Sequence, residues 1–239
     1  MTLKEAMYNR KSFRKYKNEV VNIDLLDKIN SFKSSLKPLI EDIKTDFRIV
    51  NKNEIKGIYK VKSPHYIAIY SEIKDNYLLN VGFIYEQLDI YIQSLGLGSC
   101  WFGLGKIKTN DVIVSDGVSL NFVIMIAFGY PQKDENRSLK RKNLEEISDI
   151  VDKSLEPARI APSSMNSQPW LYTHIGGKKH LYCIIQTGIK RKLLASLNKI
   201  DCGISLAHLY IEKPYNFIYY NEEKIIDLPG YYYIGSFKN

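Results

Sequence analysis

Apolar residues in the first half of the chain form short runs and one long periodic stretch. The runs at 46–50, 66–70 and 122–128 are bounded by turn-forming residues and predict three strands. Between the second and third runs, apolar side chains recur at helical spacing over 76–95, which predicts a long helix. The glycines within 96–105 predict a turn after that helix. This half therefore has the order strand, strand, helix, strand.

The second half repeats that order. Alternating apolar residues at 170–175 and 180–186 flank the sequence Gly-Gly-Lys-Lys, which is a strong signal for a β-hairpin. A helical pattern follows over 200–212, and a last strand is predicted over 231–237. A pattern of elements that occurs twice indicates an internal repeat.

A glycine stands at the same step of both long helices, Gly82 in the first and Gly203 in the second. Because glycine inside a helix costs about 1 kcal/mol relative to alanine, its recurrence suggests two helices that approach each other closely, with chance similarity as the alternative. We therefore expect an α+β fold. Two similar half-units, 1–142 and 143–239, would pack in it as a pseudo-dimer.

Two further helices are predicted from their caps. Asn22 precedes a run with apolar residues at helical spacing, and Asn143 precedes another. We expect the second of these helices, over 144–159, to link the two half-units.

The composition limits the class of protein and its partners. A chain of 239 residues with 45% hydrophobic and 25% charged residues has globular proportions. Its apolar runs are all much shorter than the stretch of about 18 residues that a membrane-spanning helix needs. The formal net charge of +8 brings nucleic acid, anionic lipid and phosphorylated small molecules into consideration. The excess lysine is spread along the chain and no RRM, KH or zinc-finger pattern accompanies it, so we expect no nucleic-acid or membrane partner.

Three cysteines, Cys100, Cys183 and Cys202, form no CxxC pair. This odd, scattered set predicts neither a disulfide framework nor a zinc site, and it favours a reducing compartment. The N-terminal residues have no apolar core or cleavage site of a signal peptide. We therefore expect a cytoplasmic protein.

Two basic segments are candidates for binding an anion. In an extended segment Arg10, Ser12 and Arg14 share one face, and forked guanidinium donors with a hydroxyl suit a phosphate monoester. Arg141 lies just before the helix that Asn143 caps, where the free N–H groups and the helix dipole favour anions. On local grounds alone, both segments are more typical of solvated charged surface.

The segment from Ala161 to Trp170 is the most distinctive in the chain. Prolines at 162 and 169 stiffen it, and the side chains between them are polar except for Met165. A stiff polar loop suits edge-on recognition of a planar heterocycle by amides and hydroxyls. An ordinary approach to the following hairpin is the alternative.

These segments resemble the flavin-dependent nitroreductase family. The resemblance rests on five stretches in order along the chain: Arg10-Lys11-Ser12-Phe13-Arg14, Gly96 to Trp101, Ala127 to Pro131, Arg141 to Glu146, and Pro162-Ser163-Ser164-Met165-Asn166-Ser167-Gln168-Pro169-Trp170. In this family the Arg-x-Ser-x-Arg motif is followed about thirty residues later by the polar loop, whereas here Ser12 and Ser163 are 151 positions apart. The chain therefore resembles a tandem, single-chain branch in which the first half-unit carries one motif and the second carries the other. The resemblance implies the family's three-layer α/β/α fold.

The resemblance implies an FMN-dependent oxidoreductase that takes hydride from NADH or NADPH and passes it, by ping-pong kinetics, to a nitroaromatic, quinone or related acceptor. Flavin N5 would carry the hydride, so no catalytic side chain is expected. One FMN per chain is expected, in a monomer, with a homodimer left open. The implied cofactor-binding residues are Arg10, Lys11, Ser12, Arg14, Gly103, Leu104, Gly105, Arg141, Pro162, Ser163, Ser164 and Asn166, with Met165 facing the substrate. A flavin carrier or sensor without turnover is the alternative.

Overall fold

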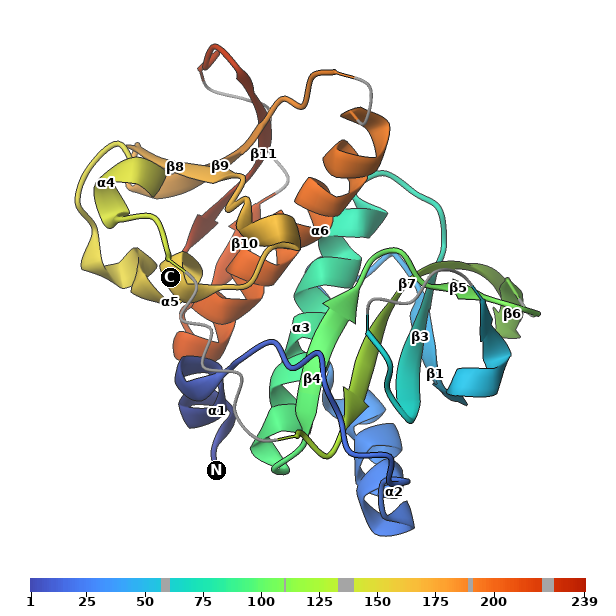
Figure 1. Cartoon of the computed structure of the whole chain (residues 1–239). Coiled ribbons are helices and arrows are strands. Elements are labelled where there is room, and N and C mark those ends of the chain that lie inside the picture. The colour runs from blue at the N-terminus through green and yellow to red at the C-terminus, as the bar shows by residue number, and fades with distance from the viewer. Residues whose placement is uncertain (57–60, 110, 133–139, 189–190, 221–225) are drawn as a thin grey trace. The chain divides into compact units, whose positions relative to one another are not determined.

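The computed structural model describes residues 1–56, 61–109, 111–132, 140–188, 191–220 and 226–239. The chain divides into two compact units, Met1–Arg137 (unit 1) and Ser138–Asn239 (unit 2). The sequence predicts the boundary between the two half-units at residues 142 and 143. Each unit contains one main antiparallel sheet and one long helix (Figure 1).

The main sheet of unit 1 has the strand order β1-β3-β7-β4, and β6 also pairs with β7. All of these pairings are antiparallel. A separate short pair joins β2 to β5. The strands are β1 (Thr45–Asn51), β2 (Ile55–Lys56), β3 (His65–Ser71), β4 (Gly98–Phe102), β5 (Lys106–Ile107), β6 (Val112–Ser115) and β7 (Val118–Gly129). The helices are α1 (Leu3–Asn9), α2 (Ile23–Ser31) and α3 (Tyr77–Ser94), with 3-10 turns at Phe32–Ser35 and Lys52–Glu54.

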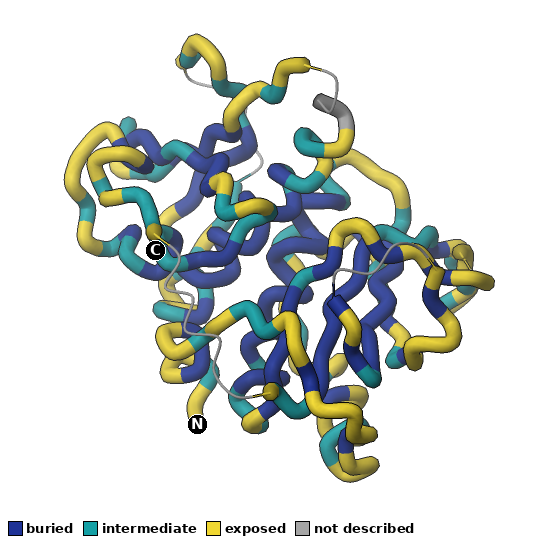
Figure 2. The backbone as a smooth tube through the Cα atoms, in the orientation of Figure 1, coloured by how far each residue is buried: buried dark blue, intermediate teal, exposed yellow. Residues whose placement is uncertain are grey.

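The core of unit 1 lies along β3 and α3. All seven residues of β3 are buried, and nearly all of α3 is buried as well, as Figure 2 shows. Several buried residues of α3 are polar, and they bind the backbone of neighbouring segments. Asn80 Oδ1 accepts from the N–H groups of Leu39 and Ile40, and the Gln87 amide binds both backbone groups of Lys37. These bonds satisfy backbone groups that no strand or helix pairs.

Unit 2 has a four-stranded antiparallel sheet in the order β10-β11-β9-β8. Gly176 and Gly177, both with positive φ, form the two-residue turn between β8 and β9. The strands are β8 (Trp170–Ile175), β9 (Lys178–Ile184), β10 (Ile218–Tyr220) and β11 (Tyr231–Lys238). The helices are α4 (Leu144–Ile147), α5 (Glu156–Ile160) and α6 (Arg191–Glu212), with 3-10 turns at Lys153–Leu155 and Ser164–Asn166.

The two units share one strand order. In each, two strands pair and a long helix follows. The last strand then lies between the second of those two strands and the first strand after the helix: β1-β3-β7-β4 in unit 1 and β8-β9-β11-β10 in unit 2. The repeat that the sequence indicates is therefore present in the topology of each unit. The pseudo-dimer packing stays a prediction.

Two sequence-based expectations about elements are wrong. The stretch 96–105 is more than a turn, because it contains β4, whose side chains are mostly buried against β7. The helix expected over 144–159 is broken. Ser148 has extended backbone geometry and forms a β-bridge with Tyr172. Pro157 lacks an N–H, so it is tolerated in the first turn of a helix but not in its interior.

Within the part of the chain that the structure describes, no helix has both the length and the apolarity needed to cross a bilayer.

Candidate functional site

The segment after α1 runs in extended form beside β4. Ser12 forms a parallel bridge with Ser99, and the Phe13 N–H donates to the Ser99 carbonyl at 2.9 Å. This close approach explains a glycine in β4, because a Cβ on Gly98 would lie 2.8 Å from Cγ of Phe13. The sequence-predicted phosphate motif is therefore fixed against the sheet of unit 1.

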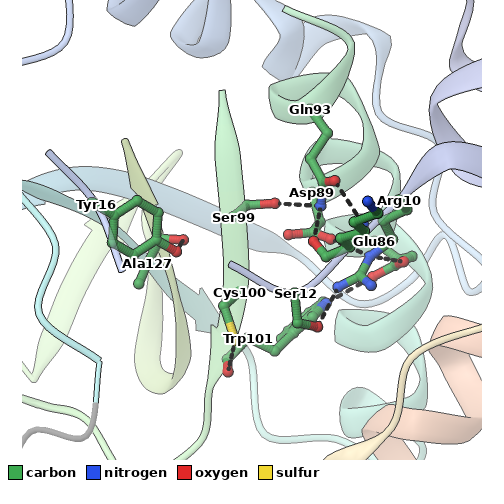
Figure 3. Close-up of polar contacts among 11 residues, drawn as sticks. Arg10, Ser12, Tyr16, Glu86, Asp89, Gln93, Ser99, Cys100, Trp101 and Ala127 are labelled. Carbon is green, nitrogen blue, oxygen red and sulfur yellow. Dashed lines mark hydrogen bonds and ion pairs between the residues drawn. The ribbon is translucent and has the colours of Figure 1, made fainter. Parts of the chain in front are cut away.

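Arg10 points into unit 1 and pairs with two carboxylates of α3 (Figure 3). Its Nε lies 2.8 Å from Asp89 Oδ2 and 3.3 Å from Glu86 Oε1. The Arg10 side chain is 4% exposed and both carboxylate side chains are fully buried. Trp101 Nε1 donates to the other oxygen of Glu86 at 2.7 Å. The residue that the motif assigns to phosphate thus has two anionic partners inside the protein.

Burial and charge act in opposite directions in this cluster. Burial disfavours the charged guanidinium, but Asp89 and Glu86 outweigh it and raise the pKa of Arg10. Burial also raises the pKa of Asp89, although Arg10 opposes that rise. Arg10 is therefore held as a cation.

The other members of the motif are less buried. Arg10 Nη2 donates to Ser12 Oγ at 3.2 Å, and the Ser12 side chain is half-buried. The side chains of Lys11 and Arg14 are exposed. The amide of Gln93 fixes the Lys11 backbone by accepting from its N–H at 3.1 Å and donating to its carbonyl at 3.0 Å.

Sequence reasoning missed the α3 residues that hold this motif. Glu86, Asp89 and Gln93 are polar residues at spacings of three and four in a mostly apolar helix. That spacing places them on one helical face. Polar residues on one face of a buried helix must find partners, so the pattern was a usable signal.

Gly103 and Leu104 are exposed in the turn after β4, and Gly105 closes it in a buried position. A Cβ on Gly105 would lie 2.7 Å from the Phe102 ring and would also collide with Met125. Packing alone therefore requires glycine at 105.

In unit 2 the polar loop has an unusual backbone. Met165, Asn166 and Gln168 all have positive φ, at 54°, 57° and 45°. Non-glycine residues seldom adopt this region, and such residues cluster at functional sites. Asp201 of α6 holds the start of the loop, because both of its carboxylate oxygens lie 3.0 Å from the Ser164 N–H.

The segment before α4 binds the same loop. Arg141 Nη1 donates to Asn166 Oδ1, and Asn166 Nδ2 donates to the Lys140 carbonyl at 2.8 Å. Lys142 binds Gln168 twice, through its backbone N–H at 2.8 Å and its Nζ at 2.9 Å. Burial lowers the pKa of Lys142, despite Glu146. The structure therefore brings together Arg141 and the loop, two sequence-predicted candidates that lie 25 residues apart.

The remaining loop candidates differ in exposure. Pro162 is buried, Ser163 and Ser164 are half-buried, and Met165 is 89% exposed. Ser163 Oγ accepts from the Gln168 N–H at 2.9 Å, which closes the loop. Gln168 was not among the sequence candidates, yet it is buried and bonded at both its backbone and its amide.

Comparison with known proteins gives one family and several related structures. The family model described as "Putative TM nitroreductase" matches residues 2–213. A Thermotoga maritima MSB8 protein described as a "putative nitroreductase" is 19% identical, with a TM-score of 0.68, and the match covers all of this chain and 93% of that one. This likeness, together with the mixed helices and sheets, confirms the expected α+β class and a fold of nitroreductase type.

Two further structures match over part of the chain. An "FMN-dependent Nitroreductase" from Clostridium difficile R20291 is 19% identical over 59% of this chain and 92% of its own, with a TM-score of 0.38. A "Putative NADH dehydrogenase/NAD(P)H nitroreductase" from Parabacteroides distasonis ATCC 8503 is 19% identical over 63% and 97%, with a TM-score of 0.45. No curated protein sequence matches the chain.

Proposed function

The chain belongs to the nitroreductase family whose model spans residues 2–213, and from this membership we propose that it is an FMN-dependent oxidoreductase using NADH or NADPH. The observation that carries the proposal is that this match includes both the 10–14 motif and the 161–170 loop. When bound, FMN supplies hydride transfer between the nicotinamide and an acceptor such as a nitroaromatic or quinone. The residues of the chain bind and orient the reactants.

In unit 1 we assign the FMN phosphate to the motif that lies along β4. Ser12 offers a hydroxyl, and Lys11 and Arg14 offer exposed cations on the same short segment. A phosphate monoester accepts several charge-assisted hydrogen bonds, so this donor set fits it. The backbone bonds from Gln93 and Ser99 support the assignment, because they hold the segment in one register.

In unit 2 we assign the flavin ring to the polar loop. Pro162, Ser163, Ser164 and Asn166 would border the ring, Arg141 would stay close to them through Asn166, and Met165 would contact the acceptor. Three positive-φ residues, together with the bonds from Asp201 and Lys142, support a preorganised recognition loop. Met165 suits planar apolar acceptors because its exposed thioether is soft and adaptable.

The turn of Gly103, Leu104 and Gly105 is the proposed source of a backbone N–H for flavin N5. The exposure of Gly103 and Leu104 supports this assignment. We further propose one FMN per chain, since the phosphate motif and the polar loop each occur once in the sequence, and we propose that the chain is a monomer.

A flavin titration tests the binding step. Purified protein should quench FMN fluorescence with one FMN per chain and show the visible absorption of bound flavin. Arg14→Gln should weaken FMN binding about tenfold or more, because it removes a charge-assisted contact. The matched control Lys17→Gln removes an exposed charge of the same segment and should leave the affinity unchanged. Protein that binds no FMN would refute the proposal.

Steady-state kinetics then test turnover. Oxidation of NADH or NADPH with a quinone or nitroaromatic acceptor should exceed the rate with free FMN, with parallel double-reciprocal lines. Stoichiometric FMN binding without such turnover would instead favour the carrier or sensor alternative.

A further inference from the structure

Arg10 already has its charge neutralised inside unit 1, which conflicts with a direct role in holding phosphate. Building on the proposed function, we propose that Arg10 is a positioning residue that directs the Ser12 hydroxyl toward the FMN phosphate and does not itself contact that phosphate. Three observations carry this inference: the ion pairs of Arg10, the direction of its bond to Ser12, and the fixed register of the segment.

The charges around Arg10 disfavour a second anion. One guanidinium faces the two buried carboxylates of Glu86 and Asp89, so the cluster has an excess of negative charge when both are ionised. A phosphate drawn to the guanidinium would approach both carboxylates in a region of weak screening. With only 4% of its side chain exposed, Arg10 also offers little surface to a ligand. An anion is therefore more stable beside the exposed side chains of Lys11 and Arg14.

The hydrogen bond to Ser12 gives Arg10 a different use. Arg10 Nη2 donates to Ser12 Oγ at 3.2 Å. Because a hydroxyl has one proton, Ser12 must then donate that proton to some other group. The nearby Cys100 thiol, whose pKa burial raises and Ser12 acts to lower, is a weak acceptor. A phosphate oxygen would outcompete it, so Arg10 leaves Ser12 as a donor ready for an anion.

The segment is held so that this donor stays in place. Gln93 binds both backbone groups of Lys11 and also donates to Ser99 Oγ at 2.8 Å, while the Phe13 N–H donates to the Ser99 carbonyl. The residues before and after Ser12, Lys11 and Phe13, are thus both held by backbone hydrogen bonds. Glu86 is fixed in turn by Trp101, which completes a chain of contacts from β4 through α3 to the Ser12 hydroxyl.

The test uses the dissociation constant of riboflavin divided by that of FMN, a ratio that reports the contribution of the phosphate alone. Ser12→Ala and Arg10→Gln should each lower this ratio about tenfold or more. If Arg10 acts through Ser12, the double variant should lower the ratio no further than either single variant. If Arg10 contacts phosphate directly, the two effects should multiply, which would overturn the inference.

Two further variants separate charge from position. In Glu86→Gln/Asp89→Asn the guanidinium loses both anions, so a direct phosphate ligand would bind more strongly and the ratio would rise. An unchanged or lowered ratio supports the positioning role.

Arg10→Lys keeps the charge but not the fork that reaches both Asp89 and Ser12. The ratio for Arg10→Lys should therefore be as low as that for Ser12→Ala. A ratio near that of the wild type would contradict the inference. This variant also serves where Arg10→Gln does not fold.

Thermal unfolding without flavin gives an independent readout. Arg10→Gln should lower the melting temperature, and Arg10→Gln/Asp89→Asn should lower it less than the sum of the two single variants, because it removes both charges of a pair. Strict additivity would contradict the ion pairing itself. If wild-type protein binds neither flavin, the proposed function fails, while this measurement still tests the buried cluster.

Discussion

His65 shows how a single buried side chain couples pH to the N-terminal segment of unit 1. The residue is buried at the start of β3, its ring is stacked with that of Phe128, and its Nε2 accepts from the Val21 N–H at 3.2 Å. An imidazole that accepts at Nε2 must be unprotonated there. Burial accordingly lowers the pKa of His65 below its usual value of 6.5.

The stability of the protein should therefore fall in mild acid. Below about pH 6.5 the unfolded chain binds a proton at His65 that the folded chain resists, so stability present above that pH is lost as the pH falls toward the folded pKa. The slope for one proton is at most about 1.4 kcal/mol per pH unit. Urea unfolding at pH 8 and pH 5.5 measures it. In His65→Gln the amide oxygen can still accept from Val21 without titrating, so this variant should lose that part of the slope. Equal slopes in the two proteins would contradict the prediction.

At the scale of elements, the polar loop of unit 2 combines strain with exposure. Met165 has a φ of 54° and is 89% exposed, so its conformation is costly while its side chain contributes little packing. Left-handed geometry costs most L-residues roughly 1–2 kcal/mol, and asparagine tolerates it better.

Met165→Asn should therefore raise the free energy of unfolding by roughly 0.5–1 kcal/mol. Ser167→Asn is a matched control, because Ser167 is exposed in the same loop with an ordinary φ of −69° and should show no gain. If Met165 contacts the acceptor, Met165→Asn should also raise KM for apolar quinones. A variant with unchanged or lower stability in urea unfolding would show that the loop is not strained at this position.

The elements that sequence predicts well are those with a regular apolar period. The long helix α3, the hairpin of β8 and β9, and the Asn22-capped α2 follow directly from spacing, turn residues and cap. The helix over 144–159 fails because Ser148 joins Tyr172 through a non-local bridge that apolar periodicity does not record.

The candidate site divides in the same way. The loop and the N-terminal motif are visible as sequence segments, and the bond between Arg141 and Asn166 joins two of the predicted residues. The ion pairs of Arg10 are not visible in its own motif, because Glu86 and Asp89 lie more than seventy residues away. A motif identifies residue types at a position, but their partners depend on the fold.

At the scale of the whole molecule, the three cysteines provide a test of how completely the chain is packed. Cys100, Cys183 and Cys202 are all buried and none forms a disulfide. Native protein should react slowly with Ellman's reagent, and denatured protein should react rapidly with three equivalents, because a buried thiol is inaccessible to the reagent. Burial also raises the pKa of Cys100 and Cys202, which disfavours their thiolates. The control is denatured protein treated beforehand with reductant, which should give the same total. Rapid reaction of even one equivalent in native protein would contradict this packing.

The strand order that the two units share has a consequence for how the chain folds. Unit 2 joins its first two strands through Gly176 and Gly177, whereas unit 1 joins β1 to β3 through residues 52 to 64. The longer connection costs about 1–2 kcal/mol more in chain-closure entropy. Nucleation should therefore be easier in the C-terminal half, where a local hairpin can form within microseconds. The same topology should thus be reached from different starting points, early and locally in the C-terminal half, and later, through more distant contacts, in the N-terminal half.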